Sequence, residues 1–165
     1  MDRYAVAGNP VSHSLSPRIH ALFARAMGDA LEYSTLEVPL DAFASTMRAF
    51  FAAGARGANV TLPFKVEALA LAHSSSERAR VAGAANFLAL REGRIEADNT
   101  DGAGLVADLE RNARFGIRGR RILVIGAGGA ARGVIAPLLA RAPASLVVAN
   151  RTPARARELE ERFRA

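Results

Sequence analysis

One segment constrains the fold more than any other: an apolar strand that runs into a glycine-rich turn and then into a helix. The strand is Ile122 to Ile125, and the turn carries Gly126, Gly128 and Ala131. A strand, a turn of this spacing and a helix in this order are typical of the first unit of a dinucleotide-binding α/β domain. A glycine-rich turn alone is a weak signal, so the flanking strand and helix make the prediction specific.

The turn is predicted to bind the pyrophosphate of a dinucleotide. Gly126 permits the tight turn, Gly128 lets the backbone approach the phosphates, and the small Ala131 allows close packing of helix on strand. Free amides at the start of the helix would bind the phosphate oxygens. The predicted cofactor loop consists of Gly126, Ala127, Gly128, Gly129, Ala130 and Ala131.

The end of the next strand, residues 145–149, indicates which dinucleotide binds. NAD-binding domains place an acidic residue near this point, whereas a nearby arginine accommodates the extra phosphate of NADP. Here the strand ends in Asn150-Arg151-Thr152, and Arg155 follows one helical turn later. The sequence therefore favours NADP over NAD. The alternative is that these arginines are only part of a solvated surface.

Strand-like and helix-like segments alternate through the rest of the chain, which predicts an α/β fold with parallel strands. Strands are expected at 4–7, 31–38 and 58–62, and a hairpin at 87–90 and 94–97. Helices are expected at 16–28, 41–54, 64–72, 75–82 and 101–116. Ser16 and Asp41 are the expected N-caps of the first two helices.

The short polar stretch Arg118 to Arg121 is the predicted domain boundary, because it contains a glycine and precedes a fully apolar strand. Residues 1–117 are then an N-terminal α/β substrate domain with a mainly parallel sheet and a linker helix. Residues 118–165 are the first part of a Rossmann NADP-binding domain.

Composition excludes several classes of function. The chain has 22 basic residues and a formal charge of +6, but the arginines are spread along the sequence, so nucleic-acid binding is not expected. No apolar run is long enough to cross a membrane, and residues 1–4 lack the features of a secretory signal. The absence of cysteine excludes disulfides and thiolate metal sites, and no metal is expected.

Lysine usage singles out one residue. Lys65 is the only lysine among the 22 basic residues. A lysine can be tuned to exchange a proton, whereas an arginine stays protonated. Lys65 is therefore a candidate for acid–base chemistry, and chance survival of a single lysine is the alternative.

Three polar clusters occupy the ends of predicted strands, where open α/β sheets bind ligands. They span residues 9–17, 59–65 and 98–102. Each alone has an alternative interpretation as a turn or a helix cap. Together they supply hydroxyls, amides, one lysine and one carboxylate, a set that suits a polyhydroxylated acid. Lys65 and Asp101 also form a candidate proton-transfer pair, which hydride transfer to a ketone requires because the alkoxide must gain a proton.

The motifs of these clusters and of the cofactor domain resemble those of the shikimate dehydrogenase family. In family order they are Ser12-His13-Ser14-Leu15-Ser16-Pro17, Asn59-Val60-Thr61-Leu62-Pro63-Phe64-Lys65, Asn99-Thr100-Asp101-Gly102, Gly126-Ala127-Gly128-Gly129-Ala130-Ala131-Arg132 and Asn150-Arg151-Thr152. The resemblance covers nearly the whole chain. It implies that Lys65 is the catalytic residue and Asp101 its partner, and that shikimate is bound by Ser14, Ser16, Asn59, Thr61, Lys65, Asn86 and Asp101.

The resemblance also implies a cofactor and a reaction. NADP would lie with its pyrophosphate on Gly126 to Ala131 and its adenosine phosphate near Asn150, Arg151 and Thr152. The reaction would be the reversible reduction of 3-dehydroshikimate to shikimate, on the route to chorismate and the aromatic amino acids. A cytoplasmic location and a small-molecule partner are expected, with neither nucleic acid nor membrane as a partner, and with a homodimer as one option for assembly.

The sequence departs from the family pattern in two ways. Phe87 stands where the family usually has threonine. Family members also continue beyond the point that corresponds to Ala165, complete the nucleotide sheet, and add a tyrosine and a glutamine to the substrate site. Two alternatives stay open at this point. One is a quinate/shikimate dehydrogenase that uses NAD, and the other is a non-catalytic fragment that binds the substrate alone.

Overall fold

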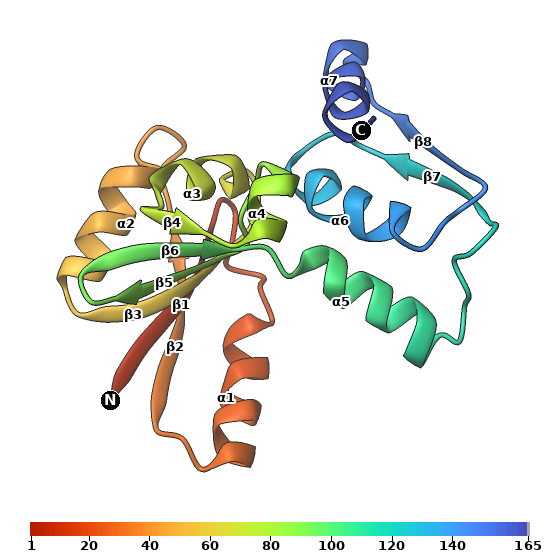
Figure 1. Cartoon of the computed structure of the whole chain (residues 1–165). Coiled ribbons are helices and arrows are strands. Elements are labelled where there is room, and N and C mark those ends of the chain that lie inside the picture. The colour runs from red at the N-terminus through yellow and green to blue at the C-terminus, as the bar shows by residue number, and fades with distance from the viewer. Residues whose placement is uncertain (165) are drawn as a thin grey trace.

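The computed structural model describes residues 1–164, which form a six-stranded sheet and a two-stranded sheet with helices on both (Figure 1). The strands are β1 (Asp2–Gly8), β2 (Leu31–Glu37), β3 (Ala55–Val60), β4 (Ser74–Ser75), β5 (Phe87–Arg91), β6 (Arg94–Asp98), β7 (Arg121–Ile125) and β8 (Ser145–Ala149). The helices are α1 (Ser16–Met27), α2 (Phe43–Ala52), α3 (Lys65–Leu71), α4 (Glu77–Ala82), α5 (Asp101–Ala107), η1 (Asp108–Asn112), α6 (Gly129–Leu139) and α7 (Pro153–Phe163).

The large sheet has the strand order β2-β1-β3-β5-β6-β4 and is mainly parallel. β1 pairs in parallel with β2 and β3, and β4 pairs in parallel with β6. The hairpin β5–β6 is antiparallel and also pairs antiparallel with β3. Its turn is Glu92-Gly93, where both residues have positive φ. The predicted α/β class and the hairpin are confirmed.

The main core lies between the large sheet and helices α2 and α3. Phe43 and Met47 of α2 are fully buried there with Phe64, which directly precedes α3. The rings of Phe43 and Phe64 stack with centroids 4.9 Å apart. This packing fixes the start of α3, and therefore the position of Lys65, its first residue.

The small sheet pairs β7 with β8 in parallel, as expected for the start of a Rossmann domain. Helices α6 and α7 cover one face, where Ile135 and Leu159 are buried. On the opposite face the side chains of Leu123, Ile125 and Val147 are 60%, 83% and 56% exposed. The strand β7, whose residues 122–125 are all apolar, is therefore covered on one face only.

Two predicted helix caps are wrong. Ser16 is the first residue of α1 rather than its cap, and the side chain of Ser14 accepts the hydrogen bond from the Ser16 amide at 3.2 Å. Asp41 does not cap α2, because residues 39–42 form a turn closed by the Ala42 amide on the Pro39 carbonyl, at 3.1 Å. The helix begins after this turn, at Phe43.

Two further elements differ from the prediction. The helix expected at 101–116 is α-helical only to Ala107 and continues as one π-helical turn, Asp108–Asn112. β4 was not predicted, since a strand of two residues carries no periodicity.

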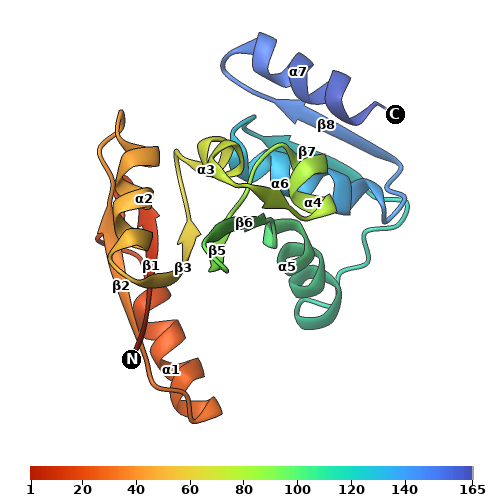
Figure 2. The same cartoon turned by 60° about the vertical axis from the view of Figure 1, so that its left-hand side comes forward.

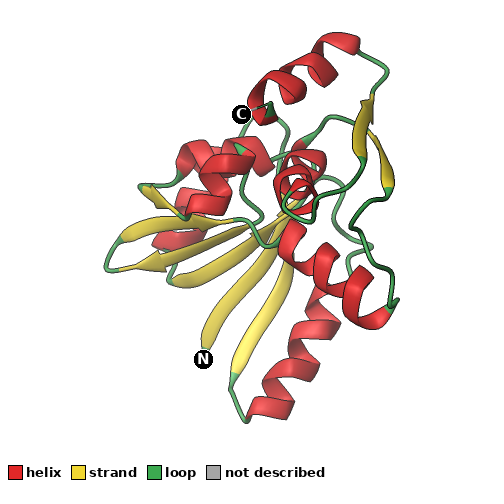
Figure 3. Ribbon diagram, turned by 45° about the vertical axis from the view of Figure 1, so that its right-hand side comes forward, coloured by secondary structure: helices red, strands yellow, loops and turns green. Residues whose placement is uncertain are grey.

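Helix α5 connects the large sheet to the small one and packs against α6, as Figures 2 and 3 show from two sides. A side-chain carbon at Gly102 would overlap the Gly133 carbonyl and the ring of Pro137, so the contact needs a bare glycine. The linker helix α5 is thus in close contact with α6. Below, the first unit is the six-stranded sheet with helices α1 to α5 and η1, and the second unit is β7, β8, α6 and α7. The predicted boundary between residues 117 and 118 stays a prediction.

Candidate active site

Lys65 and Asp101 form an ion pair at the junction of the two units. Lys65 begins α3 just after β3, and Asp101 begins α5 just after β6. The Lys65 ammonium donates to Asp101 Oδ2 at 2.5 Å, and the side chains are only 13% and 21% exposed. An ion pair shielded from water to this degree is held more strongly than one on the surface. Two residues far apart in the sequence are therefore brought together as predicted.

Asn86 orients the same carboxylate from the other side. Its Nδ2 donates to Asp101 Oδ1 at 2.9 Å and to the Thr100 hydroxyl at 2.9 Å. Its Oδ1 accepts from the Thr100 amide, also at 2.9 Å. Both carboxylate oxygens of Asp101 thus accept a hydrogen bond, Oδ2 from Lys65 and Oδ1 from Asn86. An ammonium group has three protons, so two remain on Lys65 for a ligand.

Asn99 belongs to the third polar cluster and to a family motif, but it is not among the site residues predicted from the sequence. It is 3% exposed, and its Nδ2 donates to the Ala84 carbonyl at 2.8 Å. Its Oδ1 accepts from the Asp101 amide at 3.1 Å. A side-chain carbon on Gly133 of α6 would lie 2.9 Å from Asn99 Oδ1. A polar residue between two aspartates in a strand-to-helix turn was the signal that could have identified it.

Asn59 lies next to this network and is held by a second residue that the sequence did not indicate. The hydroxyl of Tyr33 donates to Asn59 Oδ1 at 2.7 Å, and Asn59 Nδ2 donates to the Asn86 carbonyl at 3.5 Å. Burial raises the pKa of Tyr33 well above its ordinary value, against a smaller lowering by a hydrogen bond with Ser16. Tyr33 therefore stays a neutral donor, and the ring of His20 stacks on it at 4.0 Å.

Ser14 and Ser16 form a small hydroxyl pair at the start of α1. Ser14 Oγ donates to Ser16 Oγ at 3.1 Å. Thr61 lies after β3, where its amide donates to the Ala7 carbonyl at 2.9 Å. The methyl group of Thr61 fills the space above Gly8, so the ends of β1 and β3 are in contact. The three hydroxyl residues follow the carboxyl ends of neighbouring strands, as predicted.

The glycine-rich turn is adjacent to the ion pair. Gly126 has φ +111°, a conformation that favours glycine, and Gly128 is the N-cap of α6. Ala131 is buried against Leu159 and Ile135. A side-chain carbon on Gly129 would lie 2.7 Å from Cβ of Lys65. The first turn of α6 therefore packs directly on the lysine.

The turn after β8 exposes two arginines. Asn150 Nδ2 donates to the Thr152 carbonyl at 2.9 Å, and the Arg155 amide donates to the same carbonyl at 3.1 Å. Arg151 and Arg155 are exposed, and within residues 1–164 neither makes an ion pair. The turn contains no carboxylate, so it presents a positive surface.

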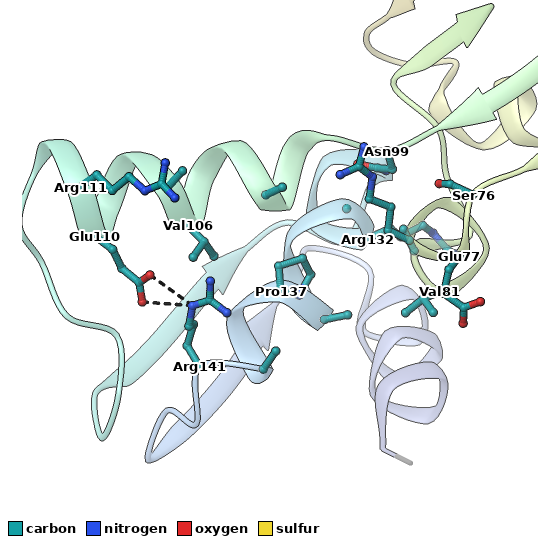
Figure 4. A pocket seen from close by; sticks show the side chains of 17 residues that line it. Ser76, Glu77, Val81, Asn99, Val106, Glu110, Arg111, Arg132, Pro137 and Arg141 are labelled. Atoms are coloured by element: carbon teal, nitrogen blue, oxygen red, sulfur yellow. Dashed lines mark hydrogen bonds and ion pairs between the residues drawn. The ribbon is translucent and has the colours of Figure 1, made fainter.

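A cavity of about 750 Å³ lies elsewhere, between α4, α5 and α6 (Figure 4). Its walls are mostly apolar and include Val81, Val106 and Pro137, and Glu110 pairs with Arg141 at its edge. It reaches Asn99, but none of the site residues predicted from the sequence lines it. The size of this cavity is therefore no guide to the position of the chemistry.

Residues 1–164 have neither a candidate metal site nor a candidate membrane span. These residues contain no cluster of His, Cys, Asp and Glu that could hold a metal ion. They also contain no helix with the length and apolar character needed to span a membrane.

Two family profiles match the chain. Residues 6–88 match the family described as "Shikimate dehydrogenase substrate binding domain". Residues 109–165 match "Shikimate / quinate 5-dehydrogenase".

Curated relatives are similar over nearly the whole chain. Shikimate dehydrogenase (NADP(+)) of Cupriavidus taiwanensis is 56% identical over 98% of this chain and 55% of the relative. That of Hahella chejuensis is 52% identical over 99% of this chain and 60% of the relative. The chain thus spans a little over half the length of these relatives.

Solved structures have the same fold. Shikimate dehydrogenase of Aquifex aeolicus superposes with a TM-score of 0.92 and 32% identity, over 99% of this chain and 61% of that one. Shikimate 5-dehydrogenase of Thermus thermophilus in complex with NADP(H) and shikimate superposes with a TM-score of 0.89 and 39% identity, again over 99% and 61%. By its sequence motifs, its fold and these matches, the chain belongs to the shikimate dehydrogenase family.

Proposed function

We propose that this chain carries the substrate-binding part and the beginning of the cofactor-binding part of an NADP-dependent shikimate dehydrogenase. The reaction is the reversible reduction of 3-dehydroshikimate to shikimate, a step of aromatic amino-acid biosynthesis. One observation carries the proposal: the shielded Lys65–Asp101 pair lies directly against Gly129 of the glycine-rich turn. Acid–base groups and a cofactor loop must be adjacent for hydride and proton to reach one substrate.

Lys65 acts as the proton donor to the alcohol oxygen during reduction, and as the acceptor in the reverse direction. Asp101 accepts one proton of the ammonium in a hydrogen bond of 2.5 Å, which fixes the direction of the remaining two. Asn86 keeps the carboxylate in place through its own bond to Oδ1. General acid–base catalysis by a positioned side chain typically contributes a factor of about 10² to 10⁴.

The substrate hydroxyls and carboxylate are bound by the polar residues around this pair. Ser14 and Ser16 present hydroxyls at the start of α1, where the helix dipole favours a negative group. The same region is bordered by Asn59 and Thr61 at the end of β3, by Asn86 just before β5 and by Asp101 just after β6. Tyr33 supports Asn59 through its buried hydroxyl.

The residues of the second unit fit the phosphates of NADP. Gly128 has open space where a side chain would be, so a pyrophosphate can approach the backbone and the first amides of α6. Arg151 and Arg155 carry unpaired charge beside the end of β8, where the 2′-phosphate of NADP lies in such domains. When bound, the cofactor supplies the hydride.

A coupled measurement tests the function. Shikimate oxidation by the 165-residue chain is followed with NADP and with NAD, and binding of shikimate and of each cofactor is measured by calorimetry. Turnover with NADP is the result expected. A clear preference for NAD would instead support a quinate/shikimate dehydrogenase. Arg151→Ala tests the same point, because it should weaken NADP binding about ten-fold or more and leave NAD binding unchanged.

A second candidate is a non-catalytic fragment, favoured by the fact that the chain spans 55% to 60% of its curated relatives. Binding of shikimate without binding of NADP and without turnover would support it. The division into residues 1–117 and 118–165, a cytoplasmic location and a homodimer remain predictions.

A further inference from the structure

Arg162 of α7 reaches across to the other unit and binds the last turn of α4. Its Nε donates to the Val81 carbonyl at 2.8 Å, and its Nη2 donates to the Arg80 carbonyl at 2.6 Å. The carbonyls of a last helical turn have no partner within the helix and carry the negative end of the dipole. The Arg162 guanidinium donates to two carbonyls of this turn at once, and the Arg80 carbonyl also accepts from the Gly83 amide at 3.2 Å.

Gly83 ends α4 in a way that makes room for this arginine. It adopts a left-handed conformation with φ +64°, and an added Cβ would lie 2.5 Å from Cζ of Arg162. Gly28 ends α1 with a similar φ of +75°, yet an added Cβ there would have nothing within 4 Å. Gly83 therefore meets two demands, the backbone conformation and the space for the guanidinium.

The segment after Gly83 leads directly into the candidate active site. The Ala84 carbonyl accepts from Asn99, which in turn accepts from the Asp101 amide. The Ala85 amide donates to the Lys65 carbonyl at 2.7 Å. The backbone that Arg162 holds at Val81 thus reaches, three and four residues later, Ala84 and Ala85. These two residues connect to Asp101 through Asn99 and to Lys65 directly.

We propose that Arg162 is a positioning residue that fixes the substrate-binding unit against the cofactor-binding unit, and so sets the position of Lys65 relative to the glycine-rich turn. Arg162 touches neither the ion pair nor the turn and acts through Gly83, Ala84 and Ala85. Its role in catalysis rests on the proposed function, whereas the contact between the units does not.

A distance measurement tests the contact independently of activity. The chain has no cysteine, so two cysteines can be introduced and spin-labelled without background. Ala49 of α2 and Glu161 of α7 are exposed and lie in different units. Pulsed electron paramagnetic resonance on the labelled chain should give one narrow distribution of distances between the two spin labels. Arg162→Ala and Gly83→Ala should both broaden or shift it, and Arg162→Lys should give an intermediate result because it keeps the charge without the fork.

Two matched variants serve as controls. Arg164→Ala removes an arginine from the same helix end, where its one ion pair within residues 1–164 is with Glu160 of its own helix. Gly28→Ala imposes the same backbone strain as Gly83→Ala but in open space. Both should keep the narrow distance of the parent chain. An unchanged distance in Arg162→Ala, in a chain whose circular dichroism shows it folded, would overturn the proposal.

Binding separates the positioning role from the proposed function. The ratio of shikimate dissociation constants without and with NADP should fall toward one in Arg162→Ala, while the affinity for shikimate alone stays that of the parent. A parent chain that binds neither ligand contradicts the proposed function, and the distance measurement still decides the contact. If the ratio of shikimate dissociation constants without and with NADP is the same in Arg162→Ala as in the parent chain, the positioning role is contradicted.

Discussion

Gly129 and Lys65 are in contact across the junction of the two units, so closely that one added methyl group would lie 2.7 Å from Cβ of the lysine. The residue that follows Gly128, the glycine proposed to approach the phosphates, is therefore also a residue that packs on the candidate active site. Gly128 and Gly129 are neighbours in one turn, but only Gly129 packs on Lys65, so substituting each glycine in turn distinguishes cofactor binding from packing.

Gly129→Ala should destabilise the unliganded chain, because α6 and α3 must move apart to admit the methyl group. Overpacking of this kind costs about 1 to 3 kcal/mol. Gly128→Ala is the matched control, since its added Cβ meets nothing within 4 Å. It should leave the unfolding free energy almost unchanged and weaken NADP binding. Urea unfolding and NADP titration distinguish the two, and equal stability of both variants would show that the Gly129 contact does not matter.

Lys65→Met should lower turnover by about two to four powers of ten, because it removes the proton donor and keeps most of the side-chain volume. Shikimate affinity should change much less, since other polar residues are proposed to bind the substrate. Steady-state kinetics with separate calorimetry measures both quantities. Retention of turnover in Lys65→Met would rule out its proton-transfer role.

Asn99→Ala should destabilise the chain although Asn99 is proposed to touch neither ligand. The substitution leaves the Ala84 carbonyl and the Asp101 amide without their partner in a buried place, which costs about 1 to 3 kcal/mol. Asn112→Ala is the control, because within the described residues the Asn112 side chain bonds to Asp108 of its own exposed turn and to no other residue. Chemical denaturation of both variants is the measurement, and a neutral Asn99→Ala would mean that water replaces the amide.

The Arg78–Asp98 pair should make stability depend on pH in the acid range. Hydrogen bonding from Arg78 lowers the pKa of Asp98 to about 2, with further lowering by Ser76 and against a smaller effect of burial. Because the folded pKa lies below the unfolded one, the pair stabilises the fold at a pH above about 4. That stabilisation is lost as the pH falls toward the folded pKa.

Arg78→Ala should therefore be less stable than the parent at pH 6, with a difference that shrinks as the pH falls and is lost as the pH passes below the folded pKa of Asp98, about 2. Unfolding curves at several pH values test this. Arg80→Ala is the control, since Arg80 pairs with Glu77 on the surface of the same short helix. A difference between Arg78→Ala and the parent that is constant with pH would contradict the assignment to Asp98.

The parts of this fold that the sequence predicted correctly are those with local causes. The strand, turn and helix around Gly126 follow from apolar periodicity and from glycine conformation. Lys65 and Asp101 were paired in advance because both follow strand ends, which meet at one edge of a sheet. The resemblance to the family motifs supplied the predicted shikimate-binding residues.

The contacts that the sequence did not predict depend on tertiary packing. Nothing local marks Tyr33 as the partner of Asn59, or Arg162 as the partner of α4. The N-cap of α1 was misplaced because a serine–proline pair is an equally good signal one position later in the helix.

The single lysine has a practical consequence for experiments on this chain. Reductive methylation with isotopically labelled formaldehyde would mark only Lys65 and the terminal amine, because every other basic side chain of the Lys and Arg set is arginine. The Lys65 ammonium is partly shielded yet 13% of its side chain remains exposed, enough for a small reagent. The labelled methyl groups on Lys65 would thus serve as a magnetic-resonance probe, whose chemical shift would report protonation of Nζ and the binding of a ligand beside it.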